Sequence, residues 1–291
     1  MTASLLTITA QTNLHPGSGD ANYGIIDKLV QRDTLTGLPV IHASSLKGAI
    51  LQHLDPQSGM TDDYIDEVFG RQVEKRWKSK RTVDGGQTGK FVFMQANLLS
   101  IPVRSNLRAF FRVSGSRVLS ELREHLLDIG LLKTTDHLAT ALATIVSESQ
   151  ARNKAIVFDD ALNGQRIHLE DLKNVECIKS KADAAELAKI KELFGGDGVI
   201  VLHNSDLRQL TDNHHLPVIA RNHLENGQST NLWYEQVLPR QTRFAFTLLR
   251  PNTLTHASDF DTRLTGQGLV QIGANASVGY GYCNISNFQT I

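Results

Sequence analysis

The stretch "HASSLKGAILQHL", residues 42–54, combines a helical pattern with residue types suited to holding an anion. Ser44 or Ser45 is expected to cap the helix, because a serine hydroxyl accepts a hydrogen bond from a free backbone N–H at this end. Lys47 stands where the capping-box pattern places an acid. A cation at the positive end of a helix dipole is unfavourable unless something anionic sits there. The stretch therefore predicts an anion-binding helix end and leaves the anion open.

Two glycine-rich segments could bring backbone N–H groups to phosphate oxygens. "HPGSG" contains Gly17 and Gly19, and "IGANASVGYG" contains Gly273, Gly279 and Gly281. Glycine lets the backbone approach a ligand closely. Either segment alone is more often a tight turn. The order Gly-Lys-Ser/Thr that defines a P-loop is absent from both.

Acid–base candidates are few. Asp27 lies in the apolar patch "GIIDKLV", just after the first glycine segment, and His15 precedes Pro16. A lone Asp usually caps a turn, and a loop histidine is as often simply packed against its neighbours. His214 and His215 lack partners at metal-ligand spacing. These residues alone do not fix a reaction.

Composition limits the class of protein. The 291 residues are 41% apolar, enough for one large domain or two small ones. Thirty basic residues balance thirty acidic ones, which argues against non-specific coating of nucleic acid. The local stretch "RQVEKRWKSKR", residues 71–81, holds six basic residues and is either a solvated loop or a nucleic-acid contact.

Targeting and redox signals point to the cytoplasm. No apolar run reaches about 18 residues, so no membrane span is expected. The N-terminus "MTASLLTITAQT" lacks the basic and long apolar regions of a signal peptide. Cys177 and Cys283 are too few for a disulfide framework and lack metal-site spacing. A reducing compartment fits this composition.

The elements that must position these residues follow no regular strand–helix alternation, which favours an α+β fold. Two extended arms are expected at 214–239, around the polar tip "ENGQST". Residues 268–288 predict two strands around the second glycine segment. Further strands are predicted at 4–12, 90–105, 106–115, 198–204 and 240–251, and helices at 62–70, 116–130, 136–151 and 183–196.

Four motifs occur in an order that resembles the RAMP superfamily of CRISPR-associated RNA-binding proteins, and within it the repeated backbone subunit of type III-B (Cmr) effector complexes. They are "LHPGSG…GIIDKLVQRDTLTGLPVIHASSLKGAI", "FMQANLLSIPVRS", "NLWYEQVLP" and "IGANASVGYGY". The resemblance runs from about residue 5 to residue 285. The chain departs from the family pattern at His42–Ala43, Gln236 and Ala274.

The resemblance implies a single RAMP domain over 1–291 with a ferredoxin-like (RRM-type) palm. A basic insertion is expected at 55–90, a helical insertion at 130–200 and a thumb-like β-hairpin at 203–240. Copies are expected to stack along a CRISPR guide RNA beside other RAMP subunits of the complex, and the anion at the helix end is then an RNA phosphate. The residues expected along the RNA are Gly17, Gly19, Arg32, Ser44, Ser45, Lys47, Arg104, Gly273, Gly279 and Gly281.

The resemblance also implies an endoribonuclease that cuts guide-paired, single-stranded target RNA at regular intervals. The RNA 2′-OH attacks the adjacent phosphate, leaving a 2′,3′-cyclic phosphate and a 5′-OH. Asp27 matches the acid that carries the chemistry, as general base or as a ligand of a divalent cation, Mg²⁺ or Mn²⁺, whose shell RNA phosphates would complete. His15 and Glu235 are secondary candidates. Two alternatives stay open: a non-catalytic structural RAMP backbone subunit, and a RAMP nuclease that processes precursor CRISPR RNA.

Overall fold

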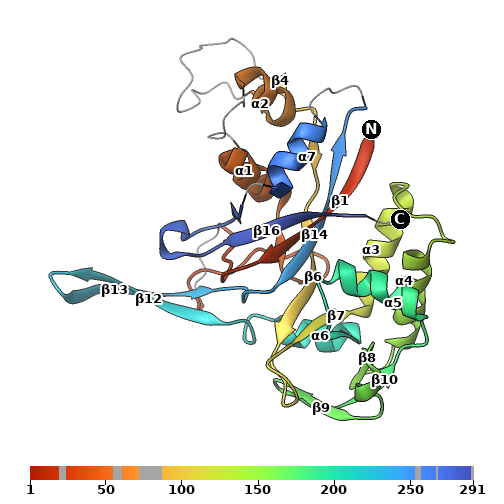
Figure 1. The fold of residues 1–291 in the computed structure, drawn as a ribbon. Helices are drawn as coiled ribbons and strands as arrows, with labels where there is room; N and C mark the ends of the chain where they lie inside the picture. Colours follow the sequence, from red (N-terminus) through yellow and green to blue (C-terminus); the bar gives the residue numbers. More distant parts are fainter. Residues whose placement is uncertain (20–23, 55–60, 72–86, 253–256, 267, 290–291) are drawn as a thin grey trace.

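The computed structural model describes residues 1–19, 24–54, 61–71, 87–252, 257–266 and 268–289, and Figure 1 draws its fold. The helices are α1 (Ala43–Leu54), α2 (Asp62–Phe69), α3 (Ser116–Asp128), α4 (His137–Glu148), α5 (Ala184–Leu193), α6 (Asn204–Leu210) and α7 (Ala257–Gly266), with short 3₁₀ turns η1 (Asp160–Leu162) and η2 (Ala276–Val278). None of these described helices is long and apolar enough to cross a membrane.

The strands are β1 (Thr2–Ala10), β2 (Val40–Ile41), β3 (Gly70–Arg71), β4 (Gln87–Thr88), β5 (Val92–Phe93), β6 (Ala96–Val103), β7 (Phe111–Gly115), β8 (Lys154–Val157), β9 (Arg166–Leu169), β10 (Leu172–Lys179), β11 (Val199–Leu202), β12 (Val218–Glu225), β13 (Gln228–Gln236), β14 (Arg243–Arg250), β15 (Val270–Gln271) and β16 (Tyr282–Phe288). Twelve of them form one sheet in the order β15-β16-β1-β14-β6-β7-β11-β8-β10-β9, with β2 and β5 paired at its side. Helices and strands mix irregularly, so the expected α+β class is confirmed.

Four neighbouring strands, β16-β1-β14-β6, form the antiparallel centre of the sheet. Along the chain, α1 lies between β1 and β6, and α7 lies between β14 and β16. These two helices contact each other, α1 also contacts β15, and α7 contacts β16 (Figure 1). Because β1 and β14 are buried along most of their length, the sheet centre is covered on both faces.

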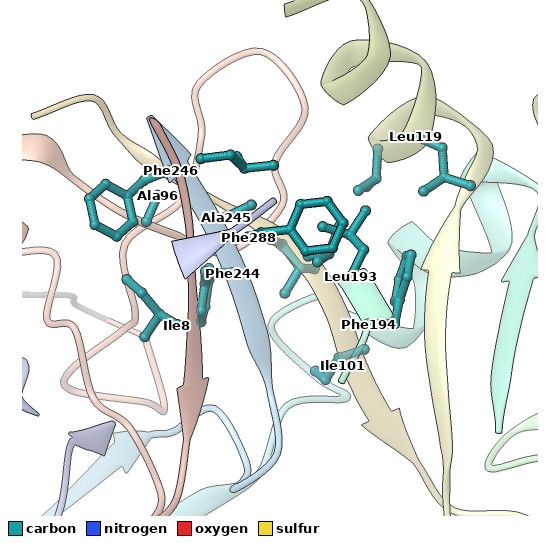
Figure 2. Packing of buried hydrophobic residues seen from close by; sticks show 14 of the residues in the cluster. Ile8, Ala96, Ile101, Leu119, Leu193, Phe194, Phe244, Ala245, Phe246 and Phe288 are labelled. Carbon is teal, nitrogen blue, oxygen red and sulfur yellow. The ribbon is translucent and has the colours of Figure 1, made fainter. Parts of the chain in front are cut away.

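The main core lies between the sheet and its covering helices. Figure 2 shows Ile8 of β1 and Phe244 and Phe246 of β14 within this cluster. Leu119 of α3 and Leu193 at the end of α5 belong to the same cluster, beyond β6. Burying such side chains contributes roughly 1.5–3 kcal/mol each. The core therefore holds the centre of the sheet rigid, which fixes the loops at its ends.

The segment 130–200 was expected to be a helical insertion, and this expectation is wrong in part. It contains α4 and α5, but it also contributes β8, β9 and β10 to the main sheet, while β11 at its end falls within the strand predicted at 198–204. β11 pairs in parallel with β7, and β8 pairs antiparallel with β11. Of the missed strands, β8 and β9 are only four residues long, too short for a clear periodic signal.

The expected hairpin is confirmed as β12 and β13, a separate two-stranded sheet that projects from the body (Figure 1). Its tip is tighter than the six-residue loop expected. Asn226 (φ 51°) and Gly227 (φ 80°) alone connect the strands, the positive-φ pattern of a two-residue hairpin turn. The expected start at residue 203 is early, because α6 and a turn precede β12.

Two other expectations need adjustment. Helix α1 begins at Ala43, so Ser44 and Ser45 lie within its first turn and do not cap it. Leu46 N–H donates to the carbonyl of His42, just ahead of the helix. Of the expected basic insertion 55–90, residues 55–60 and 72–86 lie outside the described part, and the stretch 71–81 falls almost wholly there. The described remainder of the expected insertion contains α2, β3 and β4.

Candidate functional site

The strand register brings three loops to one end of the sheet. Ala10, the last residue of β1, pairs with Cys283 of β16, and Thr9 pairs with Arg243 of β14. The loop after β1 (residues 11–39), the glycine-rich loop before β16 (273–281) and the chain from the hairpin into β14 therefore meet here. Residues far apart in sequence thus build one site.

The two glycine-rich segments pack directly on each other at His15. Ala274 N–H donates to the His15 carbonyl over 3.0 Å. A Cβ on Gly273 (φ 82°) would stand 2.4 Å from that carbonyl oxygen, and a Cβ on Gly17 would stand 3.2 Å from His15 Nε2. A side chain at position 273 would therefore force the two segments apart, and one at position 17 would press on the His15 ring within its own segment. Their glycines therefore serve close packing, whatever they also do for a ligand.

His15 itself is 2% exposed. Its Nδ1 lies 2.6 Å from the carbonyl oxygen of Gln236. Since a carbonyl can only accept, Nδ1 carries the proton and donates. His15 thus joins the loop after β1 to the end of β13, which is a positioning role.

Gln31 connects the first glycine segment to the start of α1. The side chain is 6% exposed. Its Nε2 donates to the Gly17 carbonyl over 3.0 Å and to Ser45 Oγ over 2.9 Å, while its Oε1 accepts from His42 N–H over 2.7 Å. This one amide therefore sets the spacing between the glycine segment and the helix end.

Asp27 lies against the hairpin. Its carboxylate accepts a 2.8 Å hydrogen bond from Tyr234 N–H in β13 and is exposed to solvent. The next residue, Lys28, is paired with β13 through both backbone groups: its N–H donates to Tyr234 O and its carbonyl accepts from Gln236 N–H. Val30 N–H donates to the fully buried Gln236 side chain. The Asp27 segment is thus held against the hairpin base by an isolated parallel bridge between Lys28 and Glu235.

Glu235 lies behind this segment as a buried, ionised carboxylate. It is 1% exposed and accepts from Trp233 Nε1 (2.8 Å), Lys28 Nζ (3.0 Å) and Asn275 Nδ2 (2.7 Å). Burial opposes the charge, but the hydrogen bonds from Trp233, Lys28 and Asn275 outweigh it and hold the Glu235 pKa below its ordinary value. With these partners, Glu235 is suited to positioning and poorly suited to accepting a proton.

These loops border a cleft of about 690 Å³. Of the predicted site residues, its wall includes His15, Gly17, Gly19, Asp27, Ser45 and Gly273. Lys28, Gln31 and Ala274 also line it. A second cavity of about 380 Å³, between segment 33–38, β6 and α3, contains none of the predicted site residues.

The other predicted residues lie outside the cleft wall. Ser44 is exposed at the start of α1, and Lys47 Nζ lies 5.9 Å from the Phe93 ring centre. Gly279 and Gly281 belong to the second glycine segment but do not border the cleft. Glu235 does not line the cleft either, but it binds Lys28, which does.

Two predicted arginines are used within the protein. Arg32 donates to Asn213 Oδ1 and to the Gly37 carbonyl, and burial lowers the pKa of its guanidinium. Arg104, at the end of β6, is exposed and pairs with Glu170 at 3.3 Å. The structure therefore does not bring either arginine into the cleft.

The divalent cation implied for Asp27 does not find a built site among the described residues. Asp27 is the single carboxylate among the described residues of the cleft wall, and Glu235 is already engaged by three donors. Mg²⁺ and Mn²⁺ prefer several oxygen ligands. The described cluster His137, Asp183 and Glu186 is elsewhere, and its two acids form the capping box of α5.

Sequence reasoning missed Lys28, Gln31 and Gln236. Each is a polar residue inside an otherwise apolar stretch, "IIDKLVQ" or "LWYEQVL". That interruption is the signal that could have singled them out, and for the buried Gln31 and Gln236 it also predicts hydrogen-bond partners. Their partners could not be named, since Lys28 and Glu235 are 207 positions apart.

Comparisons with known proteins agree with this architecture. The family model of the RAMP superfamily matches residues 7–284. A relative from Pyrococcus furiosus, the CRISPR system Cmr endoribonuclease Cmr4, is 26% identical over 98% of this chain and 96% of its own. A cryo-EM structure of the type III-B Cmr-beta complex bound to cognate target RNA contains a chain of similar fold, with TM-score 0.81, 25% identity and coverage of 100% of this chain and 99% of that chain.

An oligomeric crystal structure of Cmr4 from Pyrococcus furiosus shares the fold with TM-score 0.69 at 19% identity, covering 99% of this chain and 98% of that chain. The family match spans almost the whole chain, including all three loops that meet at the cleft. This protein belongs to the RAMP superfamily.

Proposed function

We propose that this protein is the guide-RNA-binding backbone subunit of a cytoplasmic type III-B CRISPR effector complex, and that it cleaves guide-paired target RNA as an endoribonuclease. Copies of it stack along the guide beside other RAMP subunits. The relatives support this proposal, because one is named a Cmr endoribonuclease and another chain of this fold belongs to a Cmr complex bound to target RNA.

One observation carries the proposal. Asp27, the cleft and the projecting hairpin form a single unit, because β13 binds the Asp27 segment through Tyr234 and Gln236. A subunit that both holds RNA and cuts it at a set position needs its reactive group tied to the element that distorts the RNA. The order β16-β1-β14-β6, with α1 and α7 as the crossing helices, supports a ferredoxin-like palm beneath this unit.

The RNA contacts divide between the cleft and the hairpin. The first turn of α1, with Ser45, offers backbone N–H groups and a hydroxyl to a guide phosphate. Lys47, one turn further, adds a positive charge. The exposed apolar residues of the hairpin, Leu224, Leu232 and Tyr234, are placed to wedge against or stack on bases.

The proposed reaction uses the RNA's own 2′-OH. Its oxygen attacks the adjacent phosphorus, the O2′–P bond forms as the P–O5′ bond breaks, and the products carry a 2′,3′-cyclic phosphate and a 5′-OH. Asp27 takes the 2′ proton as general base, and solvent supplies the proton to O5′. Flipping a nucleotide out of the stack lets its 2′-OH reach an in-line position that an A-form helix denies.

The predicted dependence on Mg²⁺ or Mn²⁺ is retained as an expectation without a step assigned to the ion. Asp27 offers a single carboxylate, so any ion bound there must take its remaining ligands from RNA phosphates and water.

Expression together with the neighbouring subunits and a guide tests the proposal. The purified complex is expected to contain several copies of this chain and one guide RNA, and to cut complementary target RNA at regular intervals. A monomer that carries no RNA after such co-expression would contradict it, and cutting of free precursor RNA would instead favour the processing nuclease.

A further inference from the structure

Lys28 directly follows Asp27 and lies in the same cleft wall. Its side chain is 54% exposed, while the carboxylate that holds it, Glu235, is 1% exposed. The Lys28 ammonium thus stands at the border between a buried anion and the open cleft. A lysine in this setting keeps donors for a second anion, because an ammonium carries three N–H groups.

Several contacts fix this ammonium in place. Glu235 Oε1 accepts from it at 3.0 Å, and the Trp233 ring centre lies 5.4 Å from Nζ. Asn275 of the second glycine segment holds the other oxygen of Glu235, and Arg221 of β12 lies 3.6 Å from it. Elements from the hairpin and from the glycine loop therefore anchor the carboxylate that holds the Lys28 ammonium.

A cation near the scissile phosphate assists this kind of cleavage. As the 2′ oxygen attacks, negative charge builds on the non-bridging oxygens of the phosphate. Among the described residues of the cleft wall, Lys28 is the one cation, and Asp27 beside it is the single carboxylate. A preorganised donor aimed at developing charge is commonly the largest single contribution to such a reaction.

We propose that Lys28 is a catalytic residue whose ammonium hydrogen-bonds a non-bridging oxygen of the scissile phosphate, and that Glu235 is the positioning residue that holds it there. Lys28 keeps its proton throughout, so the balance of the reaction is unchanged. This inference rests on the proposed ribonuclease function.

The test uses the complete guide-loaded complex under single-turnover conditions with saturating target. Lys28→Gln is expected to slow cutting by about 10²-fold, the usual effect of losing one such donor, with target binding retained. Lys28→Arg should recover part of the cutting rate. Glu235→Gln should slow cutting by less than Lys28→Gln does. Lys179→Gln is the matched control. Lys179 lies on β10, far from the cleft, and is paired with Asp160, so this variant should cut normally.

A phosphorothioate target separates a catalytic contact from a structural one. With sulfur at a non-bridging position of one mapped cut site, the unmodified complex should cut one diastereomer more slowly than the other, because sulfur accepts hydrogen bonds poorly. Lys28→Gln should cut both diastereomers equally slowly. If Lys28→Gln cuts within about twofold of the unmodified complex, or if its preference persists and Mn²⁺ relieves it, the assignment of Lys28 is overturned.

The failure of the underlying function has a different signature. If the unmodified complex binds target and leaves it intact, the ribonuclease proposal fails, and the role of Lys28 fails with it. If the unmodified complex cuts, Asp27→Asn does not, and Lys28→Gln cuts normally, the ribonuclease stands and the inference about Lys28 alone is refuted.

Discussion

Replacing Gln31 by leucine is expected to destabilise the protein and loosen the cleft at once. Leucine has nearly the same size, so it leaves little cavity but removes three hydrogen bonds. The Gly17 carbonyl and the His42 N–H lose a partner, while the Ser45 hydroxyl can turn toward water. An unsatisfied buried group costs about 1–3 kcal/mol. Because Gly17 and His42 are half-buried, a loss of about 2–3 kcal/mol in the free energy of unfolding is expected.

Urea unfolding of the isolated subunit, followed by circular dichroism, measures this loss. Gln11→Leu is the matched control, since Gln11 is exposed and donates only to the Thr9 carbonyl over 3.4 Å. That control should change stability by less than about 0.5 kcal/mol. Gln31→Leu should also weaken guide binding, because Ser45 and Gly17 lose their common anchor. Equal stability of the two variants would refute the view that Gln31 holds the cleft together.

Three other predictions address the helix end, the hairpin and pH. Lys47→Glu should weaken assembly on guide RNA and lower the slope of log affinity against log salt by roughly 0.7; an unchanged slope would make Lys47 a surface residue. Deleting Leu224, Glu225 and Gln228–Thr230 keeps the Asn226–Gly227 turn and shortens the hairpin; target cuts should slow or lose their spacing on a mapping gel, whereas guide binding persists. His215→Gln should lower the melting temperature more at about pH 5.5 than at about pH 9.

The sign of the His215 effect follows from its partners. The hydrogen bond from its ring to Asp212 raises the His215 pKa despite partial burial, and Asp171 adds to this effect. A raised pKa in the folded state stabilises the protein fully below the ordinary value of 6.5, and this stabilisation is lost as pH rises through the raised value. Equal losses of melting temperature at both pH values would show that the ion pairs contribute nothing.

Sequence reasoning succeeded where the signal was local. The period of apolar residues in "SRVLSELREHLLDIG" predicted α3, and the polar "ENGQST" between two apolar arms predicted the hairpin. The family motifs pointed to Asp27 and to the glycine segments, and the structure places Asp27, Gly17, Gly19 and Gly273 along one cleft, while Gly279 and Gly281 lie outside its wall.

It failed where the signal was long-range. β8 is held by pairing with β10 and with β11, the latter more than 40 positions away, so its local pattern could not separate strand from helix, whereas β11 falls within the strand predicted at 198–204. Gln31 and Glu235 owe their roles to contacts that only the fold creates. Arg32 and Arg104 matched family motifs, and their RNA contacts remain predictions; the contacts that they make in the structure, with Asn213 and Glu170, could not be foreseen, because a motif gives a residue type and not its surroundings.

The most direct test of the proposed function is the cleavage pattern of Asp27→Asn. The substitution keeps the shape of the side chain and an oxygen that can accept from Tyr234 N–H, so the hairpin contact should survive. In a complete guide-loaded complex, target RNA should bind with nearly unchanged affinity and remain uncut on a denaturing gel, while the unmodified complex gives a regular ladder. A regular ladder at the unmodified rate from the Asp27→Asn complex would contradict the account.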